Sequence, residues 1–514
     1  MSKKRLTISV VLIVKDEEAV LADSLDSVLW ADEIVVYDTG STDTTREIAR
    51  RYTDKVIDGY WDDDFAAARN RALEHATGDW VLSIDADEVF ESQGSTLRKH
   101  LARATEDTYG IRIINTGASS VEETFEFTAK RVFRREGHHW VGHLHEQIAT
   151  TDGQITAGGV FTGIRLRHSG YADAERMSGE KADRNTALAR DQLATAQEAG
   201  DDFEMAVARV HLSRSLVMSN DFDESVQVAE EAWAAADLLS DQLIHALAFT
   251  QYKAFLLRPD VDTDAALRWV ERWRTAQPNS AAVDVAAAEV HQRAGDIEAG
   301  LAALDRIPTV SRDGSGGELR RSSVVNLEMT LLAAAGRADE ALEVAQRAVR
   351  SRDGDPWPVV ILEALGEDAL RSLLPDLSDE QWRRWALLAV NDGGRGALRV
   401  LELMDEYRPG NGAVLASAAR VASLHGLEAA ADWDARLRRH GLGEMSVLVA
   451  FAADQRAAPA DRALAAALAV SAYSDERALP YLEEALDRVP TQGRRELAEA
   501  LDIVAPGLVT FTSD

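Results

Sequence analysis

Two patterns of apolar residues alternate along the first third of the chain. Near-continuous apolar runs, typical of buried parallel strands, are separated by segments in which apolar residues recur every three to four positions, as in amphipathic helices. The runs that predict strands are Thr7–Val14, Glu33–Tyr37, Lys55–Asp58 and Trp80–Ile84, and the segments that predict helices are Glu17–Trp30, Ser41–Tyr52 and Asp64–Ala76. This alternation predicts an α/β domain with a doubly wound, Rossmann-like sheet whose parallel strands are joined by right-handed crossovers.

The pattern loosens beyond Ser92. Two further strands are expected at Gly110–Thr116 and Thr124–Phe133, and a last one at Ile164–His168 after a glycine-rich stretch. From about Lys181 the strand signals disappear, alanine becomes very frequent and helical periodicity dominates. We therefore expect an all-α part to follow the sheet.

Turn signals divide this second part at a nearly regular spacing. They lie at Asn220–Asp221, Pro259–Asp260, Gly295–Asp296 and Gly336–Arg337, which are 39, 36 and 41 residues apart. Periods of this size are typical of stacked helical hairpins of the tetratricopeptide (TPR) type, with an irregular helical bundle as the alternative. We predict an α/β domain at residues 1–180 and a TPR-like helical domain at residues 181–514, and leave a subdivision near residue 355 open.

Composition excludes several classes of protein. The 514 residues are too many for one ordinary core, and the absence of cysteine excludes disulfides, zinc–thiolate sites and thiol nucleophiles. A formal net charge of −31 argues against nucleic acid or anionic lipid as the main partner. The basic start Met1–Arg5 precedes an apolar run that is short, β-branched and without a cleavage site, and no run is long enough to span a bilayer. We expect a soluble, cytoplasmic protein without stable membrane insertion.

Two carboxylates, Asp85 and Asp87, follow the strand Trp80–Ile84. Alternation along an extended strand end would place them on the same side, at the carboxyl edge of the sheet, where open α/β sheets bind their ligands. They would repel each other unless a cation lies between them, and hard oxygen ligands suit Mg²⁺ or Mn²⁺ bridging to a phosphate. The pair therefore predicts a site for a metal-bound sugar nucleotide.

Other polar residues lie near the ends of the predicted strands or in the helix that follows. Asp38 can accept hydrogen bonds from a base or ribose, and Gly40 permits a tight turn into the next helix. Arg69, one to two turns into its helix, can bind a base or diphosphate in a forked geometry. The pair His145-Glu146 offers a base for removing an acceptor proton, and His168 offers a third metal ligand.

Taken in order, these blocks resemble the family 2 glycosyltransferases of GT-A fold, in the bacterial branch that joins a short transferase domain to TPR-like repeats. The blocks that carry the resemblance are Ile13–Glu18, Asp38–Asp43, Asp64–Asn70, Gly78–Trp80 with Asp85–Glu88, and Gly142–Glu146 with His168–Tyr171. They cover about a third of the chain, and the helical part resembles the family in architecture only.

The resemblance implies an inverting, metal-dependent transferase that uses a nucleotide-sugar donor, with uridine diphosphate as the nucleotide. Asp38 would hold the base or ribose with Glu17 nearby, Arg69 would contact the nucleotide, and Asp85 would lie by the ribose. The metal, Mn²⁺ or Mg²⁺, would be held by Asp87, next to Asp85, with His168 completing the site.

The resemblance also implies a carboxylate base near the acceptor. We expect Glu146 to take this role with His145 beside it. The alternative is that Glu146 orients His145 or the acceptor while Glu88 acts as the base.

Competing functions remain open at this point. A nucleotidyltransferase shares strand-edge carboxylates, but it would carry a glycine- and lysine-rich phosphate loop, which Leu12–Glu18 lacks. A non-catalytic repeat scaffold with a vestigial domain is a second alternative. Relatives with this two-part build include transferases that modify Cys or Ser side chains of peptides, so we expect a peptide or protein acceptor. A cell-envelope glycan or a small metabolite is the alternative acceptor. As an alternative role for the helical repeats, they would serve only to form a homodimer.

Overall fold

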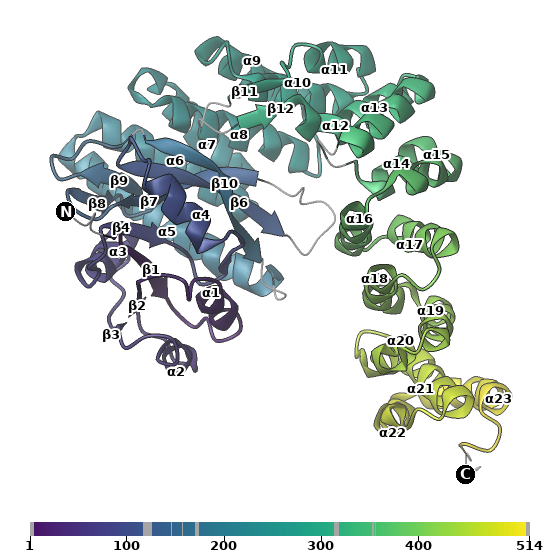
Figure 1. Cartoon of the computed structure of the whole chain (residues 1–514). Helices are drawn as coiled ribbons and strands as arrows, with labels where there is room; N and C mark the ends of the chain where they lie inside the picture. The colour runs from purple at the N-terminus through teal and green to yellow at the C-terminus, as the bar shows by residue number, and fades with distance from the viewer. Residues whose placement is uncertain are drawn as a thin grey trace. The chain divides into compact units, whose positions relative to one another are not determined.

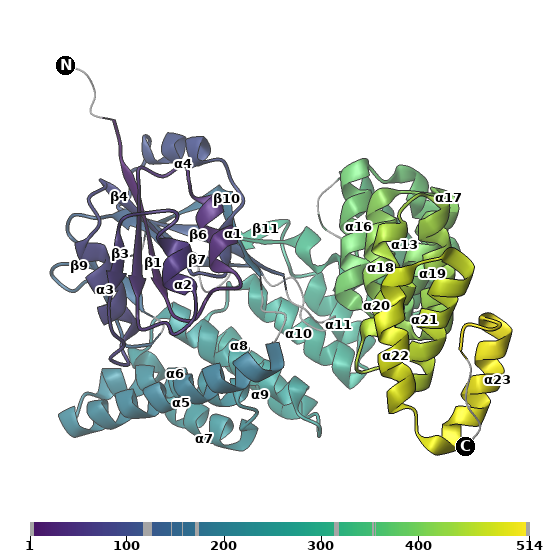
Figure 2. The same ribbon diagram turned by 90° about the horizontal axis from the view of Figure 1, so that it is seen from below.

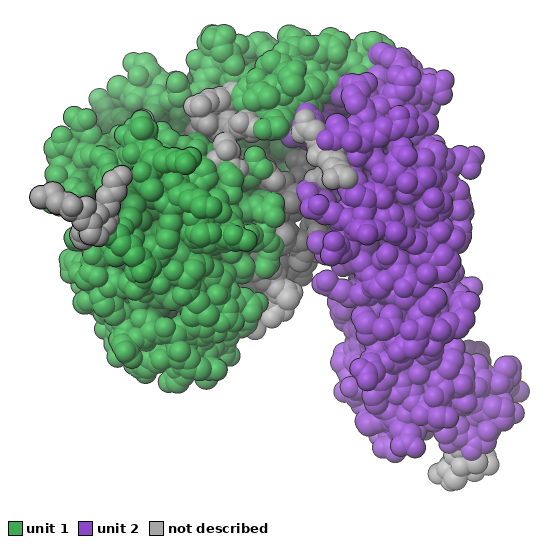
Figure 3. Space-filling view, in the orientation of Figure 1, with its two compact units in different colours: residues 1–118, 122–321 green, residues 119–121, 322–514 purple. Residues whose placement is uncertain are grey.

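The computed structural model describes residues 5–116, 126–144, 146–156, 158–169, 174–312, 318–351, 354 and 356–509. These residues form two compact units that divide at residues 321 and 322 (Figure 3). The first unit contains the sheet and the helices that follow it, and the second is helical apart from its connecting segments. The predicted boundary at residue 180 stays a prediction.

The first unit is built on an eight-stranded sheet in the order β3-β2-β1-β4-β7-β6-β10-β5. The four strands β3, β2, β1 and β4 are parallel neighbours, β7 runs antiparallel to both β4 and β6, and β10 is parallel to β6. Their bounds are β1 Ile8–Val14, β2 Glu33–Asp38, β3 Val56–Asp58, β4 Trp80–Ser83, β5 Glu88–Phe90, β6 Thr108–Thr116, β7 Glu126–Arg134 and β10 Gly159–Ser169. The predicted α/β class and the strands that define it are confirmed.

Helices cover both faces of this sheet (Figures 1 and 2). The bounds are α1 Leu21–Ser27, α2 Thr45–Ala49, α3 Phe65–Glu74 and α4 Gly94–Leu101. Apolar residues of α1, α2 and α4 share one core with strand residues such as Val10 and Leu82. Alanines of α3 share the other core with Val11 and Val81. Because neighbouring residues of a strand point to opposite faces, this division is what a doubly wound sheet requires.

Short elements escaped the sequence pattern. These are α4, the three-residue edge strand β5 and the hairpin of β8 (His138–Val141) with β9 (Gln147–Thr150). Such segments are too short to show a period, and in the hairpin polar residues and histidines interrupt the apolar positions. The start of the predicted strand Thr124–Phe133 lies outside the described residues.

The remaining helices pair into antiparallel hairpins whose turns fall where the sequence placed them. Asn220, Gly295 and Gly336 adopt positive φ angles of 59°, 77° and 74° between paired helices, a conformation that asparagine and glycine tolerate best. The helices of the first unit are α5 Ala174–Ala199, α6 Asp202–Met218, α7 Phe222–Trp233, α8 Asp241–Leu257, α9 Thr263–Ala276, α10 Ala281–Ala294 and α11 Ile297–Leu304. The helical character of this part is confirmed.

The second unit continues this theme. Its helices are α12 Val325–Ala334, α13 Ala338–Ser351, α14 Pro358–Leu365, α15 Glu367–Leu373, α16 Asp379–Asp392, α17 Arg395–Tyr407, α18 Gly412–Ala422, α19 Leu427–Arg439, α20 Val447–Ala453, α21 Pro459–Tyr473, α22 Leu479–Arg488 and α23 Arg494–Val504. In the first unit, the expectation that strands end before Lys181 is wrong at one place, because β11 (Val310–Arg312) and β12 (Glu318–Arg320) form a two-stranded ribbon. None of the helices in the described ranges is both long and apolar enough to cross a membrane.

Candidate active site at the carboxyl edge of the sheet

Asp38 ends β2 with its side chain buried at the edge of the sheet. Its Oδ1 accepts hydrogen bonds from the backbone N–H groups of Gly40 and Ser41, both at 2.9 Å. Gly40 has a φ of 114°, so the turn that supplies these donors requires a glycine. Oδ2 of Asp38 is buried and has no hydrogen-bond partner among the described residues. This oxygen is therefore available to accept a hydrogen bond from a ligand.

The loop after β1 is fastened to the loop after β2. Glu17 donates its backbone N–H to Oγ1 of Thr45 at 2.7 Å, and Asp16 donates its own to Oγ of Ser41 at 2.9 Å. Oδ1 of Asp16 accepts in return from the backbone of Thr42 at 2.7 Å. These bonds place Glu17 beside the turn that follows Asp38, and its role at the nucleotide stays a prediction.

Arg69 brings three predicted site residues together. It lies on α3, which begins after Asp64 caps it by accepting from the backbone of Ala67 at 2.8 Å. The guanidinium, only 7% exposed, donates from Nε to Oε1 of Glu146 at 2.5 Å and from Nη2 to Oδ1 of Asp85 at 2.7 Å. Nη1 donates to Oγ of Ser83 at 2.9 Å. One buried cation therefore links the carboxylate after β4 to the carboxylate before β9.

Arg131 of β7 is a site residue that the sequence did not reveal. Its Nη2 donates to Oδ2 of Asp85 at 2.6 Å and to Oε1 of Glu88 at 2.7 Å. Oε2 of Glu88 in turn accepts from the backbone N–H of Asp85 at 2.9 Å. The antiparallel register pairs Leu82 with Val132, which brings Arg131 to the end of β4. An isolated arginine in a predicted strand carries no motif, so only this register identifies it.

Opposing effects set the protonation of this cluster. Burial alone would raise the pKa of Asp85, but the neighbouring Arg131 and Arg69 lower it well below its usual range. Burial dominates at Glu88, whose pKa rises to about 7 despite Arg131, with the charge of Asp85 adding to the rise. Both arginines have raised pKa values because the carboxylates outweigh the cost of burial. The cluster therefore holds Asp85 ionised, whereas Glu88 takes up a proton more readily than an ordinary carboxylate.

Asp87 takes a different partner from Asp85. Its Oδ2 lies 2.8 Å from Nε2 of His168, near the end of β10, and the side chains are 12% and 28% exposed. β4 ends at Ser83 and the chain turns at 86–87 into β5, where the backbone of Glu88 donates to the carbonyl of Asp85 at 3.1 Å. The expected strand-like alternation stops before the pair, so one carboxylate faces arginines and the other faces a histidine.

The donor atoms at Asp87 and His168 suit part of a metal site. A carboxylate oxygen and an imidazole nitrogen side by side fit two ligands of a divalent cation whose other positions are filled by phosphate oxygens or water. Within the described ranges, no three His, Cys, Asp or Glu side chains are grouped closely enough to hold a metal ion by themselves. Both oxygens of Asp85 accept from arginines instead. Whether Asp85 contacts a metal stays a prediction.

Glu146 directly precedes β9, and its side chain is 14% exposed. Among the described residues its only hydrogen-bond donor is Arg69. His145 lies outside the described residues, so its predicted role beside Glu146 stays a prediction.

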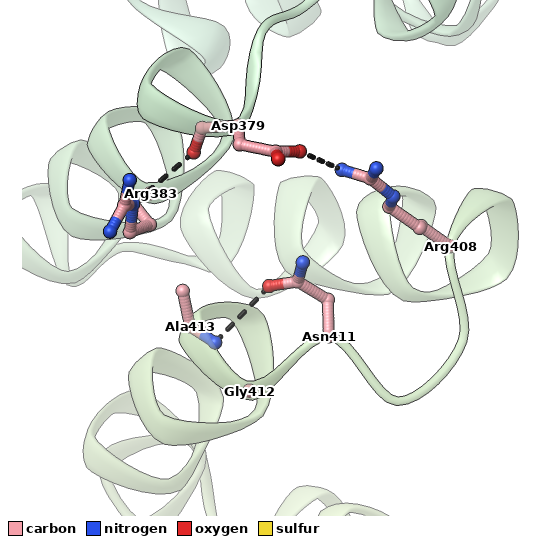
Figure 4. A pocket seen from close by; sticks show the side chains of 6 residues that line it. All are labelled: Asp379, Arg383, Arg408, Asn411, Gly412 and Ala413. Carbon is pink, nitrogen blue, oxygen red and sulfur yellow. Dashed lines mark hydrogen bonds and ion pairs between the residues drawn. The ribbon is translucent and has the colours of Figure 1, made fainter.

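A separate pocket of about 460 Å³ lies in the second unit, and none of the residues that line it belongs to the predicted site. Its lining comes from α16, the end of α17 and the start of α18 (Figure 4). Arg408 donates to Oδ1 of Asp379 at 2.8 Å, and Asn411 caps α18 by accepting from Ala413 at 3.1 Å. Nε of Arg383 donates to the backbone carbonyl of Asp379 at 3.3 Å, so Arg383 too has a partner within its own helix (Figure 4).

Residues 9–169 match the family model for glycosyl transferase family 2. The chain is 27% identical over 191 residues to the SPbeta prophage-derived glycosyltransferase SunS of Bacillus subtilis, covering 36% of this chain and 45% of that protein. It is 49% identical over 82 residues to a TPR repeat-containing protein of Synechococcus elongatus, covering 16% of this chain and 20% of that protein. The chain thus spans less than half the length of these curated relatives.

Among solved structures, a fragment of S. aureus TarS in complex with UDP-GlcNAc aligns with a TM-score of 0.27 and 14% identity. The alignment covers 58% of this chain and 90% of that fragment. The predicted resemblance of the first part of the chain to family 2 glycosyltransferases is confirmed by the family model and the named relatives.

Proposed function

We propose that this chain, whose residues 9–169 match the glycosyl transferase family 2 model, transfers a sugar from a nucleotide-sugar donor to an acceptor. The observation that supports the proposal is Arg69, which joins Asp85 and Glu146 within one buried cluster. A buried cation shared by two carboxylates at the carboxyl edge of a sheet is a costly arrangement for a scaffold and a suitable one for catalysis.

The donor would lie along the ends of β1, β2 and β4. The unpartnered Oδ2 of Asp38 supports a hydrogen bond to the base or ribose, with Glu17 beside it. Asp85, held ionised by two arginines, would accept from the ribose hydroxyls. We propose a uridine diphosphate sugar as the donor, on the family resemblance alone.

Asp87 and His168 would hold a divalent cation, Mn²⁺ or Mg²⁺, together with the diphosphate of the donor. When bound, the ion supplies Lewis-acid stabilisation of the negative charge on the leaving diphosphate. The protein would contribute the orientation of its two ligands, because His168 is fixed by the register of β10 against β5 and β6.

The proposed reaction inverts the configuration at the anomeric carbon of the donor sugar. An acceptor oxygen or sulfur would attack opposite the leaving diphosphate, its bond to the carbon forming as the carbon–oxygen bond to phosphate breaks, while its proton passes to a carboxylate. Glu146 is favoured as this base because Oε2 is left without a partner among the described residues. Both oxygens of Glu88 accept hydrogen bonds, and the residue is 1% exposed.

We propose a peptide or protein side chain as the acceptor. The support is the set of helical hairpins in both units, an architecture that commonly presents extended surfaces to peptides. A cell-envelope glycan or a small metabolite is the alternative, and a peptide array incubated with labelled donor would distinguish them.

The test of the transferase is direct. The full chain is incubated with a panel of sugar nucleotides and Mn²⁺, and release of nucleoside diphosphate is followed with and without candidate acceptors. Turnover with at least one donor, lost in Asp87→Ala, is expected. Binding of nucleoside diphosphate without turnover of any donor would instead indicate a non-catalytic domain.

A further inference from the structure

The turn between β8 and β9 contains an apolar residue that is buried although it lies in a short connection. Leu144 is 4% exposed, two residues before Glu146. It belongs to an apolar cluster with residues of three helices from the helical segment, and Phe65 and Trp61 pack against the same cluster. The helical members are Leu188 and Ala189 of α5, Leu212 and Leu216 of α6, and Val228 of α7. The turn that carries Glu146 is therefore anchored in the first helices after the sheet.

Helix α3 holds the same hairpin from the other side. The side-chain amide of Asn70 donates to the carbonyl of Trp140 and accepts from its N–H, both at 2.8 Å, as a neighbouring strand would. Phe65 donates its backbone N–H to the carbonyl of His143 at 3.1 Å. These bonds fix β8 and the start of the turn, and Arg69 contacts Glu146 at its end.

The two anchors do different things. Hydrogen bonds from α3 set the register of β8, whereas Leu144 is held by burial of its side chain in the apolar cluster. Apolar burial of a leucine is strong but non-directional, so the position of the turn depends on α5 and α6 being packed in place. Figures 1 and 2 show these helices beside the sheet within the first unit.

We propose that Leu144 is a positioning residue through which α5 and α6 hold Glu146 in the transferase site. The first helices of the helical segment thus complete the site, in addition to any part they play in recruiting an acceptor. The inference rests on the proposed function, because Glu146 is assigned there as the base. It goes beyond that function by assigning part of the catalytic geometry to helices that lie outside the family-matched residues 9–169.

The test uses three variants of the full chain. Leu144→Ala removes the anchor, Leu144→Met keeps an apolar side chain of similar size, and Leu247→Ala is the matched control. Leu247 is a fully buried leucine of α8 outside the cluster. We expect Leu144→Ala to lower kcat for transfer by roughly tenfold to a hundredfold, because small misplacements of a catalytic group have effects of this size. The KM for the donor should change less than about twofold, and Leu144→Met should recover most of kcat.

Leu247→Ala should lower the thermal stability by a similar amount and keep kcat within about twofold of the unaltered chain. An equal loss of kcat in Leu144→Ala and Leu247→Ala would overturn the inference, because it would show an effect of stability alone. Unchanged kcat in a folded Leu144→Ala would overturn it as well.

A second readout does not depend on activity. Hydrogen–deuterium exchange of the amides at 140–144 and 146–150 should accelerate in Leu144→Ala and not in Leu247→Ala. If the unaltered chain turns over no donor, the proposed function fails while this exchange result still decides whether the helices hold the turn. If turnover is present but exchange in the turn is the same in both alanine variants, the inference fails and the proposed function stands.

Discussion

Arg69 donates hydrogen bonds to Asp85 and Glu146 from two different nitrogens of one guanidinium, at 2.7 Å and 2.5 Å. These carboxylates come from different parts of the chain, one after β4 and one before β9. A lysine in place of Arg69 would present a single ammonium and could not reproduce this forked geometry together with the bond to Ser83. The geometry of the site therefore depends on this arginine as much as on its acids.

Arg69→Met should destabilise the chain by about 3 kcal/mol, because it leaves Glu146 without its cation and Asp85 with Arg131 alone. Urea denaturation followed by circular dichroism measures the loss. Arg71→Met is the matched control on the same helix, since Arg71 pairs with Asp62 at the surface. That variant should cost less than about 1 kcal/mol. Equal losses in the two variants would contradict the importance of the buried cluster.

Glu146→Gln should lower kcat for transfer by about 10²- to 10⁴-fold, because an amide cannot take the acceptor proton. The amide keeps an oxygen that can accept from Arg69, so donor affinity, measured by calorimetry with the nucleoside diphosphate and Mn²⁺, should stay nearly constant. Glu88→Gln is the informative comparison. If Glu88 were the base, the large fall in kcat would appear in that variant and Glu146→Gln would keep most of its activity.

Asp87→Asn should remove the stabilisation of the protein by divalent metal and nucleoside diphosphate, because a neutral amide is a poor ligand for a hard cation. Thermal shift with Mn²⁺ and uridine diphosphate measures this, and EDTA should have the same effect on the unaltered chain. His168→Gln should weaken the response less, since the carboxylate remains. Glu91→Gln is a suitable control, because Glu91 pairs with Arg165 and Arg167 at the surface. A full metal response in Asp87→Asn would contradict the assignment.

The sequence was sufficient for most strands of the sheet and for the grouping of several site residues. Apolar runs marked β1, β2, β4 and β6, and polar residues at the ends of β1, β2 and β4 proved to lie at one edge, because parallel strands end there together. The turns at Asn220, Gly295 and Gly336 were predictable because each needs a positive φ angle. These features depend on residues that are close together in the sequence, so they can be predicted from one sequence alone.

What the sequence could not give depends on contacts distant along the chain. Arg131 joins the site through the antiparallel pairing of β7 with β4, and nothing near it in the sequence marks that register. The different partners of Asp85 and Asp87 follow from the turn into β5, a strand of three residues. In the sequence, Leu144 is an ordinary loop residue. Its burial follows from the packing of α5 and α6 into the same apolar cluster. In each case tertiary packing, and not local pattern, sets the role of the residue.

Glu33 makes the stability of the folded chain depend on pH. It lies at the other end of β2 from Asp38 and has no part in the proposed reaction. It is at the start of β2, where its oxygens accept from Lys55, Ser9 and both the backbone and hydroxyl of Thr77. Burial alone would raise the pKa of Glu33, but these donors lower it to about 2. The carboxyl of the unfolded chain titrates near the ordinary value of 4.5. The ionised form is therefore favoured in the folded state.

A lowered pKa means that Glu33 contributes its full stabilisation above about pH 4.5 and loses it progressively as the pH falls toward 2. At pH 7 we expect Glu33→Gln to lower the free energy of unfolding by about 1–2 kcal/mol, since an amide accepts fewer of these hydrogen bonds. The difference between the two proteins should narrow as the pH is lowered from 5 to 3, measured by urea denaturation at each pH. A difference that stays constant over this range would show that the hydrogen bonds do not depend on the charge of Glu33.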